Sequence, residues 1–103
     1  MIERDLRMIG LGKRAGSVVV GTSRVRDELK RGRICLVVLA KDLSARTEEK
    51  VERLARAKGV RILQGPESGE LGRHVGERPL QAVGVLDVNL AREIGRADRA
   101  ESR

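Results

Sequence analysis

The apolar residues at the start of the chain recur with the period of a helix. Ile2, Leu6 and Ile9 fall on one face at i, i+4 and i+7, with charged residues between them. This pattern predicts a helix over residues 1–14, and we expect the glycines within residues 10–12 to end it.

The rest of the chain alternates between apolar runs typical of strands and amphipathic stretches typical of helices. Residues 34–40 are apolar throughout, as in a strand buried on both faces at the centre of a sheet. The alternation implies helices on both faces of one sheet, so the predicted fold class is α/β, a three-layer α/β/α sandwich. Strands are predicted at residues 17–20, 34–40, 60–63 and 81–86, and the later helices around residues 25–29, 47–58, 70–75 and 90–94.

Small polar residues mark the expected helix ends. Gly21-Thr22-Ser23 is typical of a turn that caps a helix, and residues 41–44 form a polar loop that can cap the next one. Asn89 is the expected cap of the last helix. Residues 97–103 have almost no apolar content and are expected to fray, so a single domain is predicted over residues 1–96.

The composition excludes several classes of protein. No stretch approaches the roughly 18 apolar residues of a membrane span, and residues 1–7 lack the apolar segment of a signal peptide. The single cysteine, Cys35, cannot form an internal disulfide or a structural zinc site, and we expect it to be buried in a strand. These features indicate a cytoplasmic protein, and 103 residues leave room for one domain.

The chain is strongly basic, and the excess charge is local. It carries 22 Lys and Arg against 15 Asp and Glu, a net charge of +7. This imbalance is typical of proteins that bind nucleic acid, with an anionic membrane or no special partner as the alternatives. Seven basic and two acidic residues give residues 13–33 a net charge of +5. Because a predicted helix starts within this segment, its free amides and dipole favour an anion site; an ordinary solvated helix face is the alternative.

Side chains that could carry other chemistry are sparse. Phe, Trp and Tyr are absent, which excludes RNA recognition by aromatic stacking. Residues 10–17 are rich in glycine, but a helix precedes them and a strand follows, the reverse of a phosphate-binding loop. His74 is the only histidine, and Asp42 at a strand end is better explained as a helix cap. Without a nucleophile, a paired base or a metal cluster, we expect no enzyme, no cofactor and no metal.

An ordered series of short motifs resembles a known family. The motifs are Leu11-Gly12-Lys13-Arg14-Ala15-Gly16, Val19-Val20-Gly21, Leu29-Lys30-Arg31-Gly32, Leu36-Val37-Val38-Leu39-Ala40-Lys41-Asp42, Leu71-Gly72-Arg73 and Val83-Gly84-Val85-Leu86-Asp87. The series resembles the small ribosomal-protein family of archaeal ribosomal protein seven-Ae and eukaryotic ribosomal protein thirty-e, with bacterial YlxQ-type members nearest. The resemblance implies a four-stranded mixed sheet and binding to RNA kink-turns, which are bulged internal loops flanked by sheared G·A pairs.

The resemblance also implies where RNA would bind and where this chain departs from the pattern. In the family, the turn after the first strand reads Gly-x-Asn-Glu, and a lysine three residues later completes the site. Gly21 and Thr22 match, but Ser23, Arg24 and Asp27 stand at the Asn, Glu and Lys positions. Arg24 cannot accept a hydrogen bond from guanine, and Asp27 repels phosphate. We therefore expect altered kink-turn recognition, while the basic segment still predicts binding to structured RNA.

The resemblance also implies that the loop before the last strand, at residues 78–81, contacts the RNA. The predicted site therefore combines phosphate contacts with readout of RNA shape by this loop and the turn at residues 21–24. Its predicted members are Lys13, Arg14, Gly21, Thr22, Ser23, Arg24, Arg26, Lys30, Arg33, Arg78, Pro79, Leu80 and Gln81. The predicted function is a monomeric, non-enzymatic binder of structured RNA such as ribosomal RNA, with the ribosome or another ribonucleoprotein as a partner and no membrane. The alternative is a protein-interaction module on the same fold that has lost standard kink-turn recognition.

Overall fold

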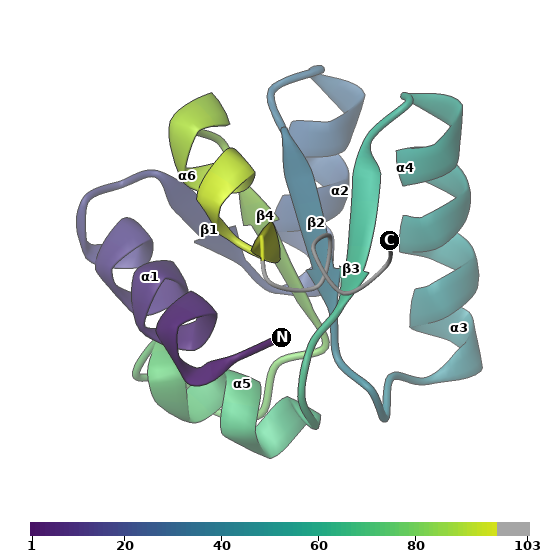
Figure 1. Ribbon diagram of the computed structural model, residues 1–103. Helices are drawn as coiled ribbons and strands as arrows, with labels where there is room; N and C mark the ends of the chain where they lie inside the picture. The colour runs from purple at the N-terminus through teal and green to yellow at the C-terminus, as the bar shows by residue number, and fades with distance from the viewer. Residues whose placement is uncertain (97–103) are drawn as a thin grey trace.

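A computed structural model describes residues 1–96 of the chain (Figure 1). The predicted tail, residues 97–103, lies outside the described residues. The elements in order are α1 (Glu3–Arg14), β1 (Val18–Val20), α2 (Thr22–Lys30), β2 (Leu36–Leu39), α3 (Ala45–Thr47), the π-helical segment η1 (Glu48–Glu52), α4 (Arg53–Ala57), β3 (Arg61–Gln64), α5 (Ser68–His74), β4 (Ala82–Val85) and α6 (Val88–Glu93). Strands β1, β2 and β4 lie inside their predicted ranges, and β3 extends one residue beyond its predicted range. Together, α3, η1 and α4 form the helix predicted over residues 47–58.

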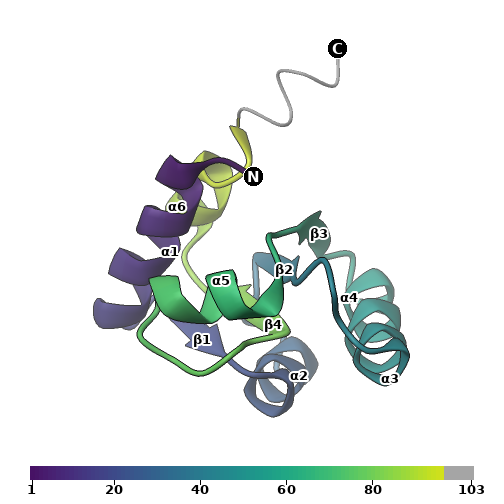
Figure 2. The same ribbon diagram turned by 90° about the horizontal axis from the view of Figure 1, so that it is seen from below.

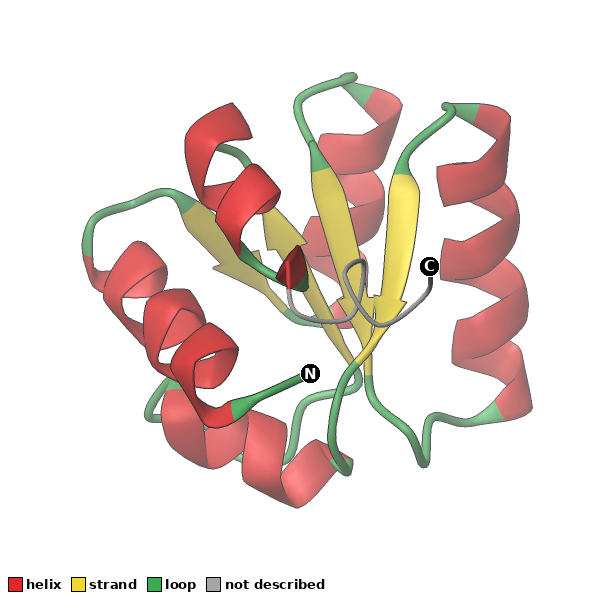
Figure 3. Ribbon diagram, viewed as in Figure 1, coloured by secondary structure: helices red, strands yellow, loops and turns green. Residues whose placement is uncertain are grey.

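The four strands form one mixed sheet in the order β1-β4-β2-β3 (Figure 3). Strand β4 is antiparallel to both β1 and β2, with Gly84 opposite Val19 and Val37, whereas β2 and β3 are parallel. As a result, β1, β2 and β3 end at the same edge of the sheet, and β4 starts there. The predicted four-stranded mixed sheet is confirmed.

Helices cover both faces of this sheet, as Figure 2 shows. Apolar residues of α1, α5 and α6 pack on one face, where Ile9, Leu71 and Ile94, the residue after α6, are fully buried. Helices α2 and α4, with η1, cover the other face, where Val25 and Leu29 are fully buried. The three-layer α/β/α sandwich is therefore confirmed, and the continuous apolar run of β2 is explained by burial on both sides.

The expected stop of the first helix at residues 10–12 is wrong, because α1 continues to Arg14. Both glycines lie inside the helix, where they permit close packing. A Cβ at Gly10 would collide with the carbonyl oxygen of His74, and one at Gly12 with the side chains of Val18 and Leu90. Glycine serves here for close approach rather than for helix termination.

Three smaller expectations are also corrected. The last helix is capped by Asp87, whose side chain accepts from the backbone amide of Leu90, and not by Asn89, which lies inside α6. Helix α2 starts from Gly21 without any side-chain cap. Cys35 precedes β2 and is only partly buried, with its Sγ donating to the Leu86 carbonyl at 3.5 Å.

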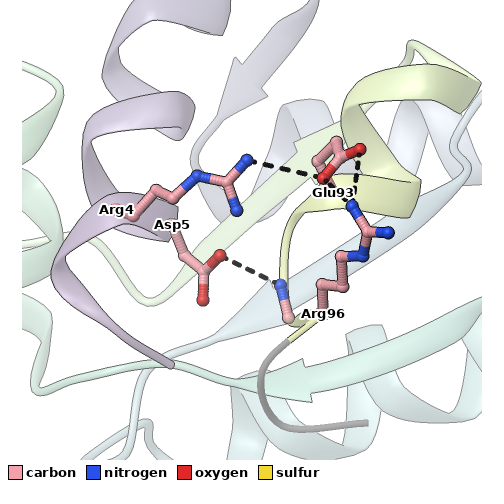
Figure 4. A network of polar contacts seen from close by, with 5 residues as sticks. Arg4, Asp5, Glu93 and Arg96 are labelled. Carbon is pink, nitrogen blue, oxygen red and sulfur yellow. Dashed lines mark hydrogen bonds and ion pairs between the residues drawn. The ribbon is translucent and has the colours of Figure 1, made fainter. Parts of the chain in front are cut away.

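One buried carboxylate joins the two ends of the described chain (Figure 4). Asp5 is the only buried charged residue within residues 1–96. It accepts hydrogen bonds from the backbone amides of Ile2, at 3.1 Å, and Gly95, at 3.2 Å. On the surface nearby, Glu93 pairs with Arg4 and Arg96. These contacts fix α1 against the end of α6.

Candidate nucleic-acid interface

Three loops meet at the edge where β1 and β2 end and β4 begins. The amide of Gly21 donates to the carbonyl of Ala82 at 3.0 Å, and the amide of Ala40 donates to the carbonyl of Gln81 at 2.9 Å. Two hydrogen bonds thus hold three segments side by side, which together we call the loop edge: residues 21–24, 41–44 and 78–81. The turn and the loop that the sequence assigned to RNA are brought together.

The start of α2 offers unsatisfied hydrogen-bond donors at this edge. The first amides of a helix have no partner within it, and nothing in the described chain accepts from the amides of residues 22–24. The first turn of α2 holds no acidic residue. By contrast, side-chain oxygens of Ser44, Asp42 and Asp87 accept from amides at the starts of α3, α5 and α6. Helix α2 therefore presents an open, positively polarised end.

The loop before β4 is held in place by the protein around it. The amide of Leu80 donates to the backbone carbonyl of Ser68 at 3.0 Å, and the side-chain oxygen of Gln81 accepts from the amide of Ser44 at 3.0 Å. Leu80 is half-buried and packs against the core, whereas Arg78 and Pro79 are exposed. Leu80 and Gln81 thus serve mainly to shape the loop, and Arg78 and Pro79 are its outward contacts.

The third segment of the edge was not predicted as part of the site. Asp42 accepts from the amide of Ser68 at 2.7 Å and from its hydroxyl at 3.0 Å. The backbone hydrogen bond from Ser68 is the main reason why the pKa of Asp42 lies below its ordinary value. Its role as a helix cap is confirmed, although the helix is α5 rather than the next one. Lys41, directly before it, is exposed and unpaired within residues 1–96.

The basic residues of α2 do not share one surface. Arg24 lines a hollow of about 620 Å³ along β1, together with Lys13 and Arg33. Arg26 and Lys30 line a separate groove toward α4. The side chains of Arg24, Arg26 and Lys30 form no hydrogen bond or ion pair within the described part of the chain.

Two of the predicted phosphate contacts are already engaged by carboxylates. Lys13 donates to the Val75 carbonyl at 3.0 Å and to Glu77 at 2.7 Å, which lowers the pKa of Glu77. Arg33 donates to Glu28 at 2.7 Å, and this hydrogen bond is the main reason why the pKa of Glu28 is lowered. Both ion pairs are partly exposed, so a polyanion can compete for them.

Lys13 and Arg14 lie apart from the start of α2 along the chain. Both residues lie in the last turn of α1, before β1, whereas α2 starts after β1. They are therefore not next to the first amides of α2 along the chain. Arg14 is exposed and unpaired in the described region.

Comparisons with known proteins agree with this architecture. The sequence model of the ribosomal protein L7Ae/L30e/S12e/Gadd45 family matches residues 7–94. The RNA-binding protein YlxQ of Bacillus subtilis (strain 168) is 31% identical over 87 residues, which cover 84% of this chain and 87% of that protein.

Solved structures show the same fold at lower sequence identity. A protein of unknown function from Bacillus halodurans superposes with a TM-score of 0.86 at 23% identity, over 92% of this chain and 96% of that one. The 15.5 kD RNA-binding protein of Giardia lamblia superposes with a TM-score of 0.75 at 21% identity, over 97% of this chain and 92% of that one.

Proposed function

Because the chain belongs to the ribosomal protein L7Ae/L30e/S12e/Gadd45 family, we propose that it is a non-enzymatic RNA-binding protein that recognises structured RNA through the loop edge. The name of the Bacillus subtilis relative supports RNA as the ligand. The observation that carries the proposal is the open end of α2, whose three free amides belong to a loop edge that also carries the exposed, unpaired basic residues Arg24, Lys41 and Arg78. Free amides and basic side chains are the groups that bind phosphate oxygens.

The same geometry suggests how RNA shape is read. A phosphate at a bend of the backbone would accept hydrogen bonds from the amides of residues 22–24. Arg24 can then donate to the acceptor edge of a guanine or to a second phosphate. Pro79 offers an exposed apolar surface against an unpaired base, a contact that needs no aromatic side chain. The RNA is of the kink-turn type or ribosomal, and the departures at Ser23, Arg24 and Asp27 make recognition differ from that of the standard family site.

In the proposed role, the protein acts as a monomer with a single domain over residues 1–96. It works in the cytoplasm as part of the ribosome or another ribonucleoprotein. No helix in the described region is long and apolar enough to cross a membrane. The domain needs no cofactor for this role, because amides, guanidinium groups and shape supply the recognition.

The proposal is tested by titrating a kink-turn RNA and a fully paired duplex of equal length at several salt concentrations. Arg24→Gln/Arg78→Gln removes two charges from the loop edge. Arg7→Gln/Arg73→Gln removes two exposed, unpaired charges from α1 and α5 and serves as the matched control. We expect the first variant to bind the kink-turn about tenfold more weakly, with the salt slope flatter by about 1–2, and the control to bind normally. Equal losses in both variants would refute the assignment of the site.

A second candidate function, a protein-interaction module, is favoured by the free edge of β1. Ser17 and Gly21 form backbone hydrogen bonds with the β4 side. Because the hydrogen-bonding direction of the backbone alternates along a strand, the amide and carbonyl groups of Val18 and Val20 point away from the sheet. An extended peptide can pair with such an edge. If the protein shows no salt-dependent binding to either the kink-turn RNA or the duplex, the protein-interaction function replaces the RNA-binding one.

A further inference from the structure

A basic groove runs along the outer face of the molecule between two parallel helices. Helix α2 and the helix formed by α3, η1 and α4 lie side by side on one face of the sheet (Figure 2). Both begin at the loop edge and run away from it. A groove of about 540 Å³ lies between them, lined by five basic residues and one acidic one: Arg26, Lys30, Arg46, Lys50, Arg53 and Glu49. Three of the five basic residues come from outside the segment that the sequence marked as basic.

Four of the five basic side chains in this groove lack partners within residues 1–96. Glu49, its only carboxylate, is bonded to Arg53 at 3.2 Å. The side chains of the four remaining basic residues form no hydrogen bond or ion pair with the described part of the chain. The Nε of Arg26 is buried and has no hydrogen-bond partner. Because like charges repel across the groove, an external polyanion that enters it relieves this repulsion.

The basic residues are also spaced as an extended anion requires. Arg26 and Lys30 are one helical turn apart on α2, and Arg46 and Lys50 are about one turn apart on the opposite wall. One turn advances the helix by about 5–6 Å. A strand of nucleic acid carries one phosphate per nucleotide, so it would meet a basic residue at successive steps on both walls. A point anion such as free phosphate would use only one of these positions.

The groove is continuous with the loop edge. Arg46 lies two residues after Ser44, whose amide donates to the side chain of Gln81 in the loop before β4. On the other wall, Arg26 lies one helical turn from the open end of α2. We propose that the groove between α2 and α3–α4 binds the phosphate backbone of an RNA stem that leaves the element bound at the loop edge. This inference rests on the proposed RNA-binding function and assigns it a second contact surface.

The test separates the two surfaces by changing the length of the RNA. A kink-turn RNA with short stems is compared with two RNAs in which one stem or the other is extended by about one helical turn. In the wild type, one of the two extensions is expected to tighten binding about tenfold and to steepen the salt slope by about 2. Arg46→Gln/Lys50→Gln is expected to abolish this gain and to leave binding to the short RNA within twofold of the wild type.

Matched variants exclude trivial explanations. Arg7→Gln/Arg73→Gln carries the same change in charge on the opposite face, and it is expected to keep the full gain from the extended stem. Lys50→Glu, a single substitution at an exposed position, should reverse the gain, and thermal unfolding verifies that each variant is folded. If the wild type gains nothing from either extension, or if Arg46→Gln/Lys50→Gln keeps the gain, the groove proposal is overturned while the loop edge stands. If the short RNA itself shows no salt-dependent binding, the proposed function fails, and the groove proposal with it.

Discussion

Ser23→Asp is expected to stabilise the folded protein and to weaken RNA binding at the same time. Ser23 is the second residue of α2 and is exposed, and the amides beside it have no acceptor within the described chain. A carboxylate there interacts favourably with the positive end of the helix. It also takes the position and the amides that we assign to a phosphate. Stability and function should therefore change in opposite directions.

Asn89→Asp provides the matched control. Asn89 is likewise the second residue of its helix, α6, and is exposed. Helix α6 follows the end of β4, whereas the loop edge lies at the start of β4. The two substitutions thus add the same charge at the same helical position, at opposite ends of one strand. Any difference between them reports on the place of the charge rather than on its presence.

The expected magnitudes follow from the exposure of both positions. A charge at an exposed helix end contributes about 0.3–1 kcal/mol, so both variants should unfold at a slightly higher urea concentration. A carboxylate about 4 Å from a phosphate costs about 1 kcal/mol with the dielectric constant of water and about 4 kcal/mol with an effective value near 20. For Ser23→Asp we expect a loss of about 1–3 kcal/mol, which is roughly a 5- to 150-fold weaker affinity.

Fluorescence anisotropy with a labelled kink-turn RNA at one fixed salt concentration measures the affinities, and urea unfolding measures the stabilities. Asn89→Asp should bind within twofold of the wild type. If Ser23→Asp binds as tightly as the wild type, or if both variants lose affinity equally, the open end of α2 is not the anion site.

Three further predictions concern the altered turn, the buried carboxylate and the histidine. Ser23→Asn/Arg24→Glu/Asp27→Lys rebuilds the family turn without changing the net charge. This variant should bind a kink-turn RNA about tenfold more tightly than the wild type and a duplex with unchanged affinity. If the variant and the wild type bind the kink-turn equally well, the departures at these positions do not weaken recognition. Asp5→Ala leaves the buried amide of Gly95 and the partly buried amide of Ile2 without an acceptor. It should lower the free energy of unfolding, measured in urea, by about 2–4 kcal/mol, whereas a loss below about 1 kcal/mol would contradict the role of these hydrogen bonds. The hydrogen bond of His74 to the Glu70 carbonyl and the nearby carboxylate of Glu3 raise the pKa of His74. Its contribution to stability is therefore complete below pH about 6.5 and is lost as the pH rises through the higher pKa of the folded state. His74→Gln should flatten this part of the plot of unfolding free energy against pH, and an unchanged plot would exclude a contribution from His74.

Most of the fold could be predicted from the sequence because the pattern of apolar residues has two clear periods. The run around β2 and the helical spacing of Ile2, Leu6 and Ile9 needed no long-range information. The glycines of α1 could not be interpreted in the same way. A glycine that ends a helix and one that admits a neighbouring backbone look alike in a sequence. Only the approach of the His74 carbonyl to Gly10 distinguishes them.

Part of the candidate site was visible for the same local reasons. The turn at residues 21–24 was marked by its glycine, and the positive φ of 98° at Gly21 agrees with that choice of residue. Lys41 was missed because its neighbours in space, residues 21–24 and 78–81, are distant in sequence. The end of the buried strand before it was the one available signal, because functional side chains often follow such ends in α/β folds.

The basic residues show why charge has to be counted by surface rather than by segment. Within residues 13–33, Arg31 and Arg33 share Glu28, which the local net charge already counts, whereas Lys13 pairs with Glu77 from outside the segment. The local net charge therefore overstates what is available there. Residues 41–58 have a net charge of only +2, because four acidic residues offset six basic ones. Glu49 and Glu52 bond to arginines one turn along the same helix. That pairing leaves Arg46 and Lys50, which face α2 across the groove, without a carboxylate partner. A polyanion bound at the loop edge is then attracted along the groove.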